Sequence, residues 1–254
     1  MPQTYGARVI VLRKTKLGES DLVLTMLAED GSQLRAVAKG ARKPASSFAS
    51  RLELYAVADV LLARGRSLDV VKEARLVEGN ERLRLDMEHA ACAAPMAELL
   101  DRATHTGLEN PRLFALTRTA LAALGRARPQ EAPAMCAAHL VKALALLGLR
   151  PSFTLCARCG AEVARHDGGD VRVSFREGGV LCADCASLVE ARVVPQGALA
   201  WCEALLGSTF SQIEDLKPDL SASFSVLRFC QEWTKEHVGF NLKSLNFLFT
   251  CGLF

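Results

Sequence analysis

The stretch LVLTMLAEDGSQLRAVA, residues 22–38, decides the fold of the first part of this chain. Residues 22–28 alternate in polarity, and residues 32–38 alternate again with a leucine and two alanines on one face. Successive side chains of a strand point to opposite faces, so each half is typical of a strand with one buried face. Asp30-Gly31 lies between the halves and favours a tight turn. The stretch therefore predicts an antiparallel hairpin.

Three further runs with strand-like composition flank this hairpin, at residues 7–12, 52–63 and 68–77. Five strands with no helical period between them predict a small barrel, closed or partly open. An SH3-like barrel fits the number of strands almost as well.

From Asn80 onward the apolar residues recur at helical spacing. Asn110-Pro111 predicts a helix start, because asparagine caps helices and proline fits the first turn. Residues 134–147 are apolar almost all round and predict a buried helix that ends at Gly148. Residues 220–237 predict an amphipathic helix.

These patterns predict an α+β multidomain protein. A β-barrel domain is expected at residues 1–79 and an α-helical domain at residues 80–254, and an insertion at residues 152–193 is expected to interrupt the helical domain.

The insertion contains four cysteines in the pattern C-x₂-C-x₂₂-C-x₂-C, here called the cysteine quartet: Cys156, Cys159, Cys182 and Cys185. Two C-x-x-C turns can direct four sulfurs at one centre, and four thiolates leave no open coordination position. The quartet therefore predicts one structural Zn²⁺ in a ribbon, with a strand at residues 171–175. An iron site has the same ligands and stays open as an alternative, as does redox use of one pair. His166 is a spare ligand by position but is expected in an exposed loop.

The remaining cysteines lie along apolar stretches and are expected to be small buried hydrophobes. They are Cys92, Cys136, Cys202, Cys230 and Cys251.

A second signal is the basic segment, residues 31–52, which contains no acidic residue. Its five cations are Arg35, Lys39, Arg42, Lys43 and Arg51. A flexible, hydroxyl-rich loop between barrel strands can follow a phosphate backbone, so the segment predicts electrostatic nucleic-acid binding with little sequence preference. An ordinary solvated loop is the alternative. Cations near the predicted strand ends could extend the patch: Arg13, Lys14, Lys16, Arg64 and Arg66.

Composition limits the other classes of function. The formal net charge is only +3, so a polyanion must meet a local patch. No apolar run approaches the ~18 to 20 residues that span a bilayer, and the first residues do not resemble a signal peptide, so a cytoplasmic protein is expected. The chain has no phosphate-binding loop, dinucleotide motif, H-E-x-x-H or G-x-S-x-G, and nothing in it indicates an enzyme.

Several short motifs carry a resemblance over most of the chain. They are VIVLR at 9–13, GESD at 18–21 with Leu24-Thr25, Asp30-Gly31 followed by VAKGAR at 37–42, the cysteine quartet, and LKSL at 242–245. Together they resemble the RecO family of recombination-mediator DNA repair proteins, in its zinc-bearing branch.

The resemblance implies an N-terminal OB-fold, a helical domain and a zinc-ribbon insertion. It implies a non-catalytic protein that binds single- and double-stranded DNA and anneals complementary strands. RecR, the C-terminal tail of single-strand-binding protein (SSB) and, indirectly, RecA are the implied partners. Carried onto this sequence, it makes Lys39, Arg42 and Lys43 the foremost DNA contacts and Lys243 a weaker one.

Two other classes of function compete with this interpretation. In the first, the chain is a zinc-ribbon protein–protein scaffold whose barrel never meets nucleic acid. In the second, it is a thiol-redox enzyme that uses one C-x-x-C pair, which predicts a titratable low-pKa thiol and no stoichiometric metal.

Overall fold

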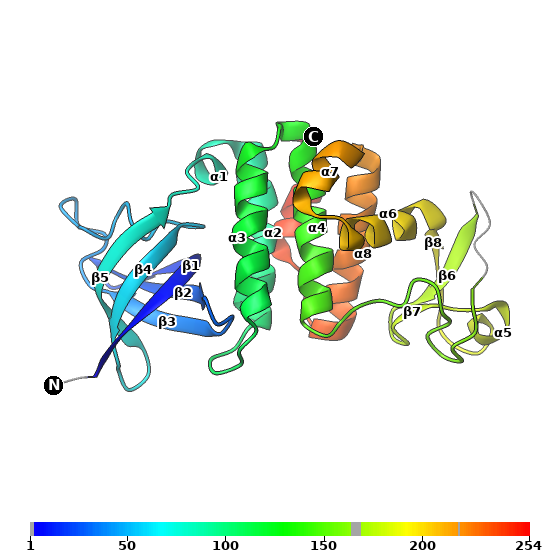
Figure 1. The fold of residues 1–254 in the computed structure, drawn as a ribbon, viewed down its shortest axis with the longest axis horizontal. Coiled ribbons are helices and arrows are strands. Elements are labelled where there is room, and N and C mark those ends of the chain that lie inside the picture. The colour runs from blue at the N-terminus through cyan, green and yellow to red at the C-terminus, as the bar shows by residue number, and fades with distance from the viewer. Residues whose placement is uncertain (1–2, 164–168, 218) are drawn as a thin grey trace. The chain divides into compact units, whose positions relative to one another are not determined.

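The computed structural model describes residues 3–163, 169–217 and 219–254 (Figure 1). The chain divides into two units, Met1–Arg126 and Ala127–Phe254. Within the described residues, no helix has both the length and the apolar character needed to cross a membrane.

The first unit begins with a closed barrel of five strands (Figure 1). The strands are β1 (Thr4–Leu17), β2 (Asp21–Ala28), β3 (Gln33–Ala38), β4 (Val57–Ala63) and β5 (Asp69–Glu78). Around the barrel their order is β1-β2-β3-β5-β4, and β3 runs parallel to β5. This order, in which the first strand pairs with both the second and the fourth, is that of an OB-fold. The structure confirms the predicted barrel and rules out the SH3-like alternative.

The predicted hairpin forms as expected. β2 pairs antiparallel with β3, and Gly31 in the turn adopts a φ of 84°, a conformation that favours glycine. Leu24, Met26, Ala36 and Ala38 point into the barrel and are fully buried. The alternation of polarity therefore identified the inner face correctly.

One strand starts later than predicted. β4 begins at Val57 and not at residue 52, because Tyr55 has a φ of 67°, which a strand cannot continue through. Leu52, Tyr55 and Ala56 are nevertheless buried. They pack against the barrel from a loop, so their apolar pattern resembled that of a strand.

Three helices complete the first unit: α1 (Arg82–Leu85), α2 (Met87–Ala103) and α3 (Pro111–Arg126). α2 packs on β1 and β2, and the Gln33 side chain donates a hydrogen bond to the Asp101 carbonyl at 2.8 Å. α3 starts at Pro111, as predicted. Because these helices share a unit with the barrel, the proposed domain boundary after residue 79 stays a prediction.

The second unit is mostly helical. Its helices are η1 (Pro129–Glu131), α4 (Ala132–Leu146), α5 (Ala183–Ala186), α6 (Gln196–Gly207), α7 (Phe210–Leu216), α8 (Leu220–Val238) and α9 (Lys243–Thr250). α4 is buried along most of its length and contacts α6, α7 and α8, which confirms the predicted central helix. Gly148 follows it with a φ of 83°.

The insertion that contains the cysteine quartet also has a small sheet (Figure 1). It consists of β6 (Asp170–Ser174), β7 (Gly179–Val180) and β8 (Arg192–Pro195), in the order β7-β6-β8. The strand at β6 was predicted, whereas β8 was not. Aromatic rings connect this sheet to α8: Phe175 packs on Phe229 and Trp233, with centroid separations of 5.4 and 5.9 Å. The Trp233 indole nitrogen also donates a hydrogen bond to the Leu149 carbonyl at 2.8 Å.

Candidate nucleic-acid interface and metal site

The first C-x-x-C pair lies in a tight knuckle. Leu155 bridges to Glu162, and the Gly160 amide donates a hydrogen bond to the Cys156 carbonyl at 2.9 Å. Gly160 has a φ of 76°, so glycine suits this position. The second pair begins just before α5, and the Ala157 amide joins the two knuckles by donating a hydrogen bond to the Val180 carbonyl at 2.8 Å.

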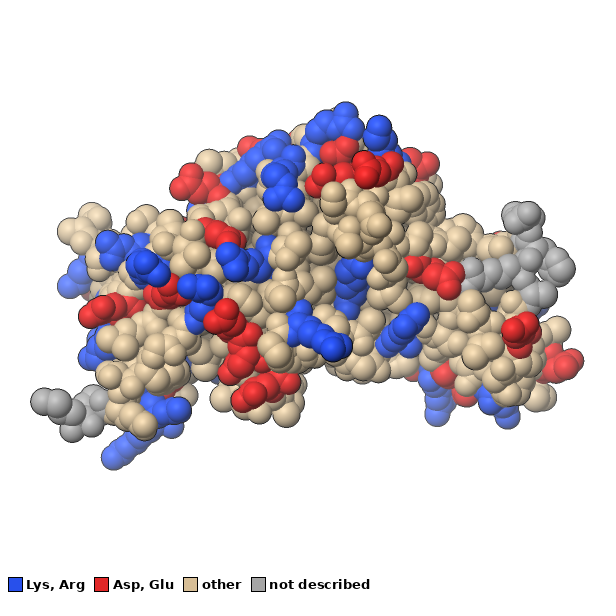
Figure 2. All heavy atoms as spheres, viewed as in Figure 1, with Lys and Arg blue, Asp and Glu red and all other residues tan. Residues whose placement is uncertain are grey.

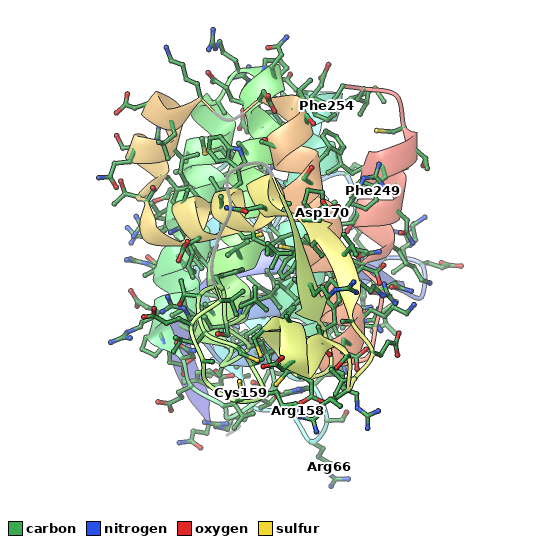
Figure 3. All side chains as sticks on the ribbon, turned by 90° about the vertical axis from the view of Figure 1, so that its right-hand side faces the viewer. Arg66, Arg158, Cys159, Asp170, Phe249 and Phe254 are labelled. Atoms are coloured by element: carbon green, nitrogen blue, oxygen red, sulfur yellow. The ribbon has the colours of Figure 1, made fainter. Side chains whose placement is uncertain are left out.

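The four sulfurs of the quartet all lie within 4.8 Å of one another, and the Sγ atoms of Cys159 and Cys182 are 3.7 Å apart. A tetrahedral ion with Zn–S bonds of about 2.3 Å separates its sulfurs by about 3.8 Å. Cys156 and Cys185 are buried, Cys182 is half-buried, and Cys159 lies at the surface (Figure 3). The quartet can therefore hold a metal ion.

Two thiols of the quartet have pKa values shifted in opposite directions. Burial opposes ionisation of Cys156, but the backbone N–H groups of Cys182 and Cys159 outweigh it and lower the pKa of this thiol to about 6. Hydrogen bonds from its thiol to the neighbouring sulfurs, led by Cys182, raise the pKa of Cys185 to about 12. Four thiolates at this spacing require positive charge to offset their repulsion.

Redox use of one pair stays a prediction. Cys156 is only 2% exposed, but Cys159 of the same C-x-x-C pair lies at the surface, where a thiol partner can reach it. His166 lies outside the described residues. Of the other cysteines, Cys92, Cys136, Cys202 and Cys230 are buried as predicted. Cys251 is only half-buried.

The basic segment comprises the end of the β2–β3 turn, β3 and the β3–β4 loop as far as Leu52. Arg35 projects from the outer face of β3, and Lys39 and Lys43 lie in the loop; all three are exposed. Among the described residues these three side chains make no hydrogen bond or ion pair. Arg51 is exposed as well and donates a hydrogen bond to the Ala74 carbonyl at 3.2 Å.

Arg42 has a structural role in addition to its charge. Its Nη1 donates hydrogen bonds to the carbonyls of Gly18 and Glu19, at 3.1 and 2.8 Å, and so fastens the loop to the β1–β2 turn. Asp21 strengthens this junction, because its carboxylate accepts a hydrogen bond from the Gly40 amide at 2.8 Å. That bond, aided by the charge of Lys39 and Lys43, lowers the pKa of Asp21.

Strand register places two connections at one rim of the barrel. Lys16 pairs with Leu22, which pairs with Ala38, so the β1–β2 turn adjoins the start of the β3–β4 loop. The β4–β5 turn lies by the start of β1, where Thr4 pairs with Ala63. OB-folds bind oligonucleotides through the face of the second and third strands and the loops that follow the first and fourth strands, so the β1–β2 turn of this rim is an expected contact.

The structure separates the possible extensions of this patch into two groups. Arg13 forms an ion pair with Asp101 at 2.9 Å and Lys14 forms one with Glu53 at 2.7 Å, so their charges are compensated. Lys16, Arg64 and Arg66 are exposed. The guanidinium of Arg64 lies 4.7 Å from the centre of the Tyr5 ring, and Arg66 extends away from its turn (Figure 3).

Lys243, the last of the predicted DNA contacts, belongs to the second unit. It is the first residue of α9 and is exposed. Leu245, two residues later, is fully buried. The rim of the barrel does not include Lys243.

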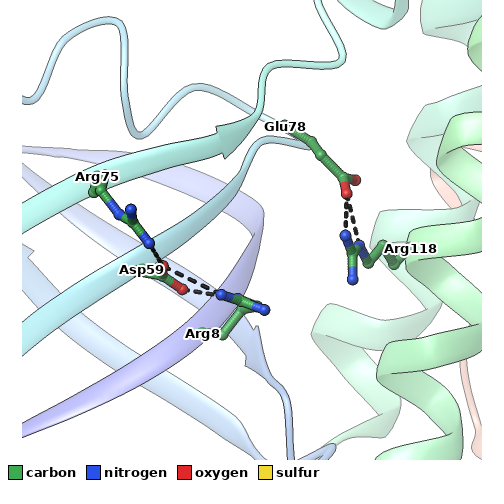
Figure 4. A network of polar contacts seen from close by, with 5 residues as sticks. All are labelled: Arg8, Asp59, Arg75, Glu78 and Arg118. Carbon is green, nitrogen blue, oxygen red and sulfur yellow. Dashed lines mark hydrogen bonds and ion pairs between the residues drawn. The ribbon is translucent and has the colours of Figure 1, made fainter.

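Sequence reasoning missed two features. One is a row of charges on the barrel, in which Arg8 and Arg75 flank Asp59 and Arg118 of α3 meets Glu78 (Figure 4). Only the strand register reveals it. The other is an apolar pocket of about 290 Å³ in the second unit, beside β8 and α8.

Comparisons with known proteins agree with the fold. Residues 1–80 match the family described as Recombination protein O N terminal, and residues 84–246 match Recombination protein O C terminal. A protein called DNA repair protein RecO from Desulfitobacterium hafniense is 32% identical over 94% of this chain and 87% of its own length. One from Symbiobacterium thermophilum is 30% identical over 97% of both chains. The chain therefore belongs to the RecO family of DNA repair proteins.

Proposed function

We propose that this chain is a recombination mediator that binds single- and double-stranded DNA and anneals complementary strands without catalysing a reaction. The observation that carries the proposal is the set of exposed cations of the basic segment beside the β1–β2 turn of an OB-fold, one of the loops through which this fold binds oligonucleotides. Lys39 and Lys43, with Arg35 beside them, have no carboxylate partner among the described residues, so their charge is available to phosphates. Arg42, Arg51 and Lys243 are proposed as further contacts.

Charge neutralisation accounts for annealing. Two complementary strands repel each other through their phosphates, and cations that displace condensed counterions lower this repulsion. A loop that grips backbone and few bases leaves the base edges free to pair. This role places the protein in the cytoplasm, at the nucleoid.

For the metal site we propose one structural Zn²⁺. Four cysteine sulfurs at tetrahedral spacing fit a single closed ion, and such a site stabilises a small fold directly. The ribbon around the quartet has a core of few residues, led by Leu181 with Cys156 and Cys185. The metal would therefore supply stability that apolar burial alone does not.

In the second unit we propose a site for the C-terminal tail of SSB. The apolar pocket is lined by Phe175, Val193 and Phe229. Arg228 and Arg192 line it as well, the latter paired with Glu232 at 2.8 Å. A chain end offers one carboxylate next to its last side chain, which suits an apolar pocket with a neighbouring arginine. With RecR as partner, the protein would use this contact to help load RecA onto SSB-coated DNA.

The test of this function is the annealing of two complementary labelled strands, followed by energy transfer between their dyes. We expect the wild-type protein to accelerate annealing at low salt, and the Lys39→Gln/Lys43→Gln variant to lose most of that acceleration. A wild-type protein that neither binds DNA nor accelerates annealing at low salt would favour the scaffold alternative.

The tail site has its own test. Val193 is 56% exposed and belongs to the second unit, whereas the proposed DNA rim belongs to the first, so Val193→Glu should leave DNA binding unchanged. It should weaken binding of an SSB tail peptide at least tenfold, as measured by fluorescence anisotropy. Unchanged peptide affinity would place the tail elsewhere.

A further inference from the structure

A groove of about 850 Å³ lies on the outer face of the barrel, across β1, β4 and β5. Its volume falls within the range of about 300 to 1,000 Å³ that is usual for ligand sites. One wall is formed by Ser47, Phe48 and Arg51, which belong to the second half of the β3–β4 loop. Figure 2 shows basic and acidic side chains intermixed over this part of the barrel.

A row of three charges crosses the groove in exact strand register. Arg8 of β1 pairs with Asp59 of β4, and Asp59 pairs with Arg75 of β5. The ion pairs to Asp59 measure 2.8 Å from Arg8 and 2.7 Å from Arg75 (Figure 4). Hydrogen bonds from the two arginines lower the pKa of Asp59 to about 2, so the carboxylate stays ionised. Two guanidinium groups thus share one carboxylate, and Arg75, 79% exposed, keeps N–H groups for another anion.

Two further cations line the groove. A β-bulge in β5 leaves Lys72 without a partner on β4, because Leu62 pairs with Val71 and Leu61 pairs with Glu73. Bulges commonly redirect a side chain beside a binding site, and Lys72 is exposed. Arg51 is the other cation. The lining thus has four cations and three carboxylates, those of Glu29, Asp59 and Glu73.

The floor of the groove is open at Gly6. This residue lies in the middle of the pairing between β1 and β4, and a glycine inside a strand often marks close approach of a ligand. A Cβ atom placed there would meet nothing nearer than the Val60 carbonyl oxygen at 4.0 Å. Packing of the barrel therefore does not require glycine at this position.

We propose that this groove binds a second segment of single-stranded nucleic acid, with phosphates on Arg51, Lys72 and Arg75 and a base against Phe48. The inference rests on the proposed function and adds a second site to it. A nucleic acid suits the groove better than an acidic peptide because the site joins guanidinium groups to an aromatic side chain. In addition, its wall continues the loop whose first half carries Lys39 and Lys43. Two strand segments on one barrel would meet at this loop.

The experiment counts how many single-stranded DNA molecules one protein chain binds. Oligothymidylate of about eight nucleotides suits the site size of one OB-fold, and titration at low salt measures stoichiometry and both affinities. We expect two strands per chain for the wild type. Lys72→Gln/Arg75→Gln should weaken one of them about 25-fold at about 0.1 M salt, since two phosphate contacts are lost. Lys39→Gln/Lys43→Gln should weaken the other.

Gly6→Phe provides a second variant that fills the groove without changing the charge. It should abolish binding of the same oligothymidylate molecule that Lys72→Gln/Arg75→Gln weakens. If the Gly6→Phe variant fails to fold, the Lys72 and Arg75 substitutions alone test the groove site. Both side chains are exposed, so their replacement should not disturb folding. One strand per wild-type chain, lost only in the Lys39/Lys43 variant, overturns the groove site and leaves the proposed function intact. No strand on any protein overturns both. Binding of oligoglutamate in the groove, but not of oligothymidylate, assigns the groove to an acidic partner and overturns the proposal.

Discussion

Replacing Lys39 and Lys43 by glutamine tests the proposed DNA site with little disturbance of the fold. Both side chains are exposed, and within the described residues neither has a hydrogen-bond or ion-pair partner. Arg42 stays in place because it fastens the β1–β2 turn through two carbonyls. The double variant therefore removes charge and leaves the junction between loop and barrel intact.

The expected magnitude follows from counterion release. Each cation on a single strand contributes about 0.7 to the slope of log K against log salt, so the slope should become shallower by about 1.4. At about 0.1 M salt this corresponds to about 25-fold weaker binding, or about 1.9 kcal/mol. Including Arg42→Gln should raise the loss to about 100-fold if its guanidinium also meets a phosphate.

The assay is fluorescence anisotropy of a labelled single strand across a salt series. Arg112→Gln/Lys235→Gln is the matched control, because it makes the same change in net charge at two exposed helical positions. The reasoning is refuted if the Lys39/Lys43 variant and this control have the same slope and affinity. In that case the DNA contact lies away from the β3–β4 loop.

Three further predictions concern the metal, the hairpin turn and acid stability. One zinc per chain is expected by atomic absorption, and a chelator should expose the four thiols of the quartet to a thiol reagent while the barrel stays folded; a metal-free, folded ribbon would contradict this. Gly31→Ala should destabilise the protein by at least about 2 kcal/mol in urea unfolding, because its φ is +84° and a Cβ would lie 1.9 Å from the Asn110 carbonyl oxygen. Gly18→Ala, with φ +56° and no atom within 4 Å, should cost less, and equal losses would contradict the steric argument. Because the folded pKa of Asp59 is about 2, below its unfolded value of about 3.9, its contribution to stability should be present above about pH 4 and disappear as the pH falls toward 2; an Asp59→Asn variant with an unchanged acid-unfolding profile would contradict it.

Local patterns predicted much of the fold. The hairpin at residues 22–38 formed because alternation and the Asp30-Gly31 turn depend on neighbours in sequence. The start of α3 at Pro111 has a similarly local cause. The predicted start of β4 was wrong. Residues 52–56 include buried apolar side chains in a loop, and such a pattern resembles that of a strand. β8 was missed because its four residues are mostly exposed and show no clear alternation.

The candidate sites divide in the same way. C-x-x-C spacing is a local property, and the four sulfurs do converge. Compensation of charge is not local: Arg13 is neutralised by Asp101 on α2, and Lys14 by Glu53 in a loop. The sequence named these two cations only as possible extensions of the basic patch, and the folded chain shows that both are paired.

The sequence by itself determined that the chain begins with a five-stranded barrel, places four cysteines at metal-binding spacing and carries a basic segment without acidic residues. Periodicity, turn chemistry and ligand spacing act over a few residues, so they are present in the sequence directly. The tertiary structure decided which cations remain available, and it created the groove over β1, β4 and β5. Closing the barrel aligns Arg8, Asp59 and Arg75 from three strands, and the bulge that leaves Lys72 unpaired exists only when β5 meets β4. Such contacts depend on strand register, which is set by the packing of the whole barrel.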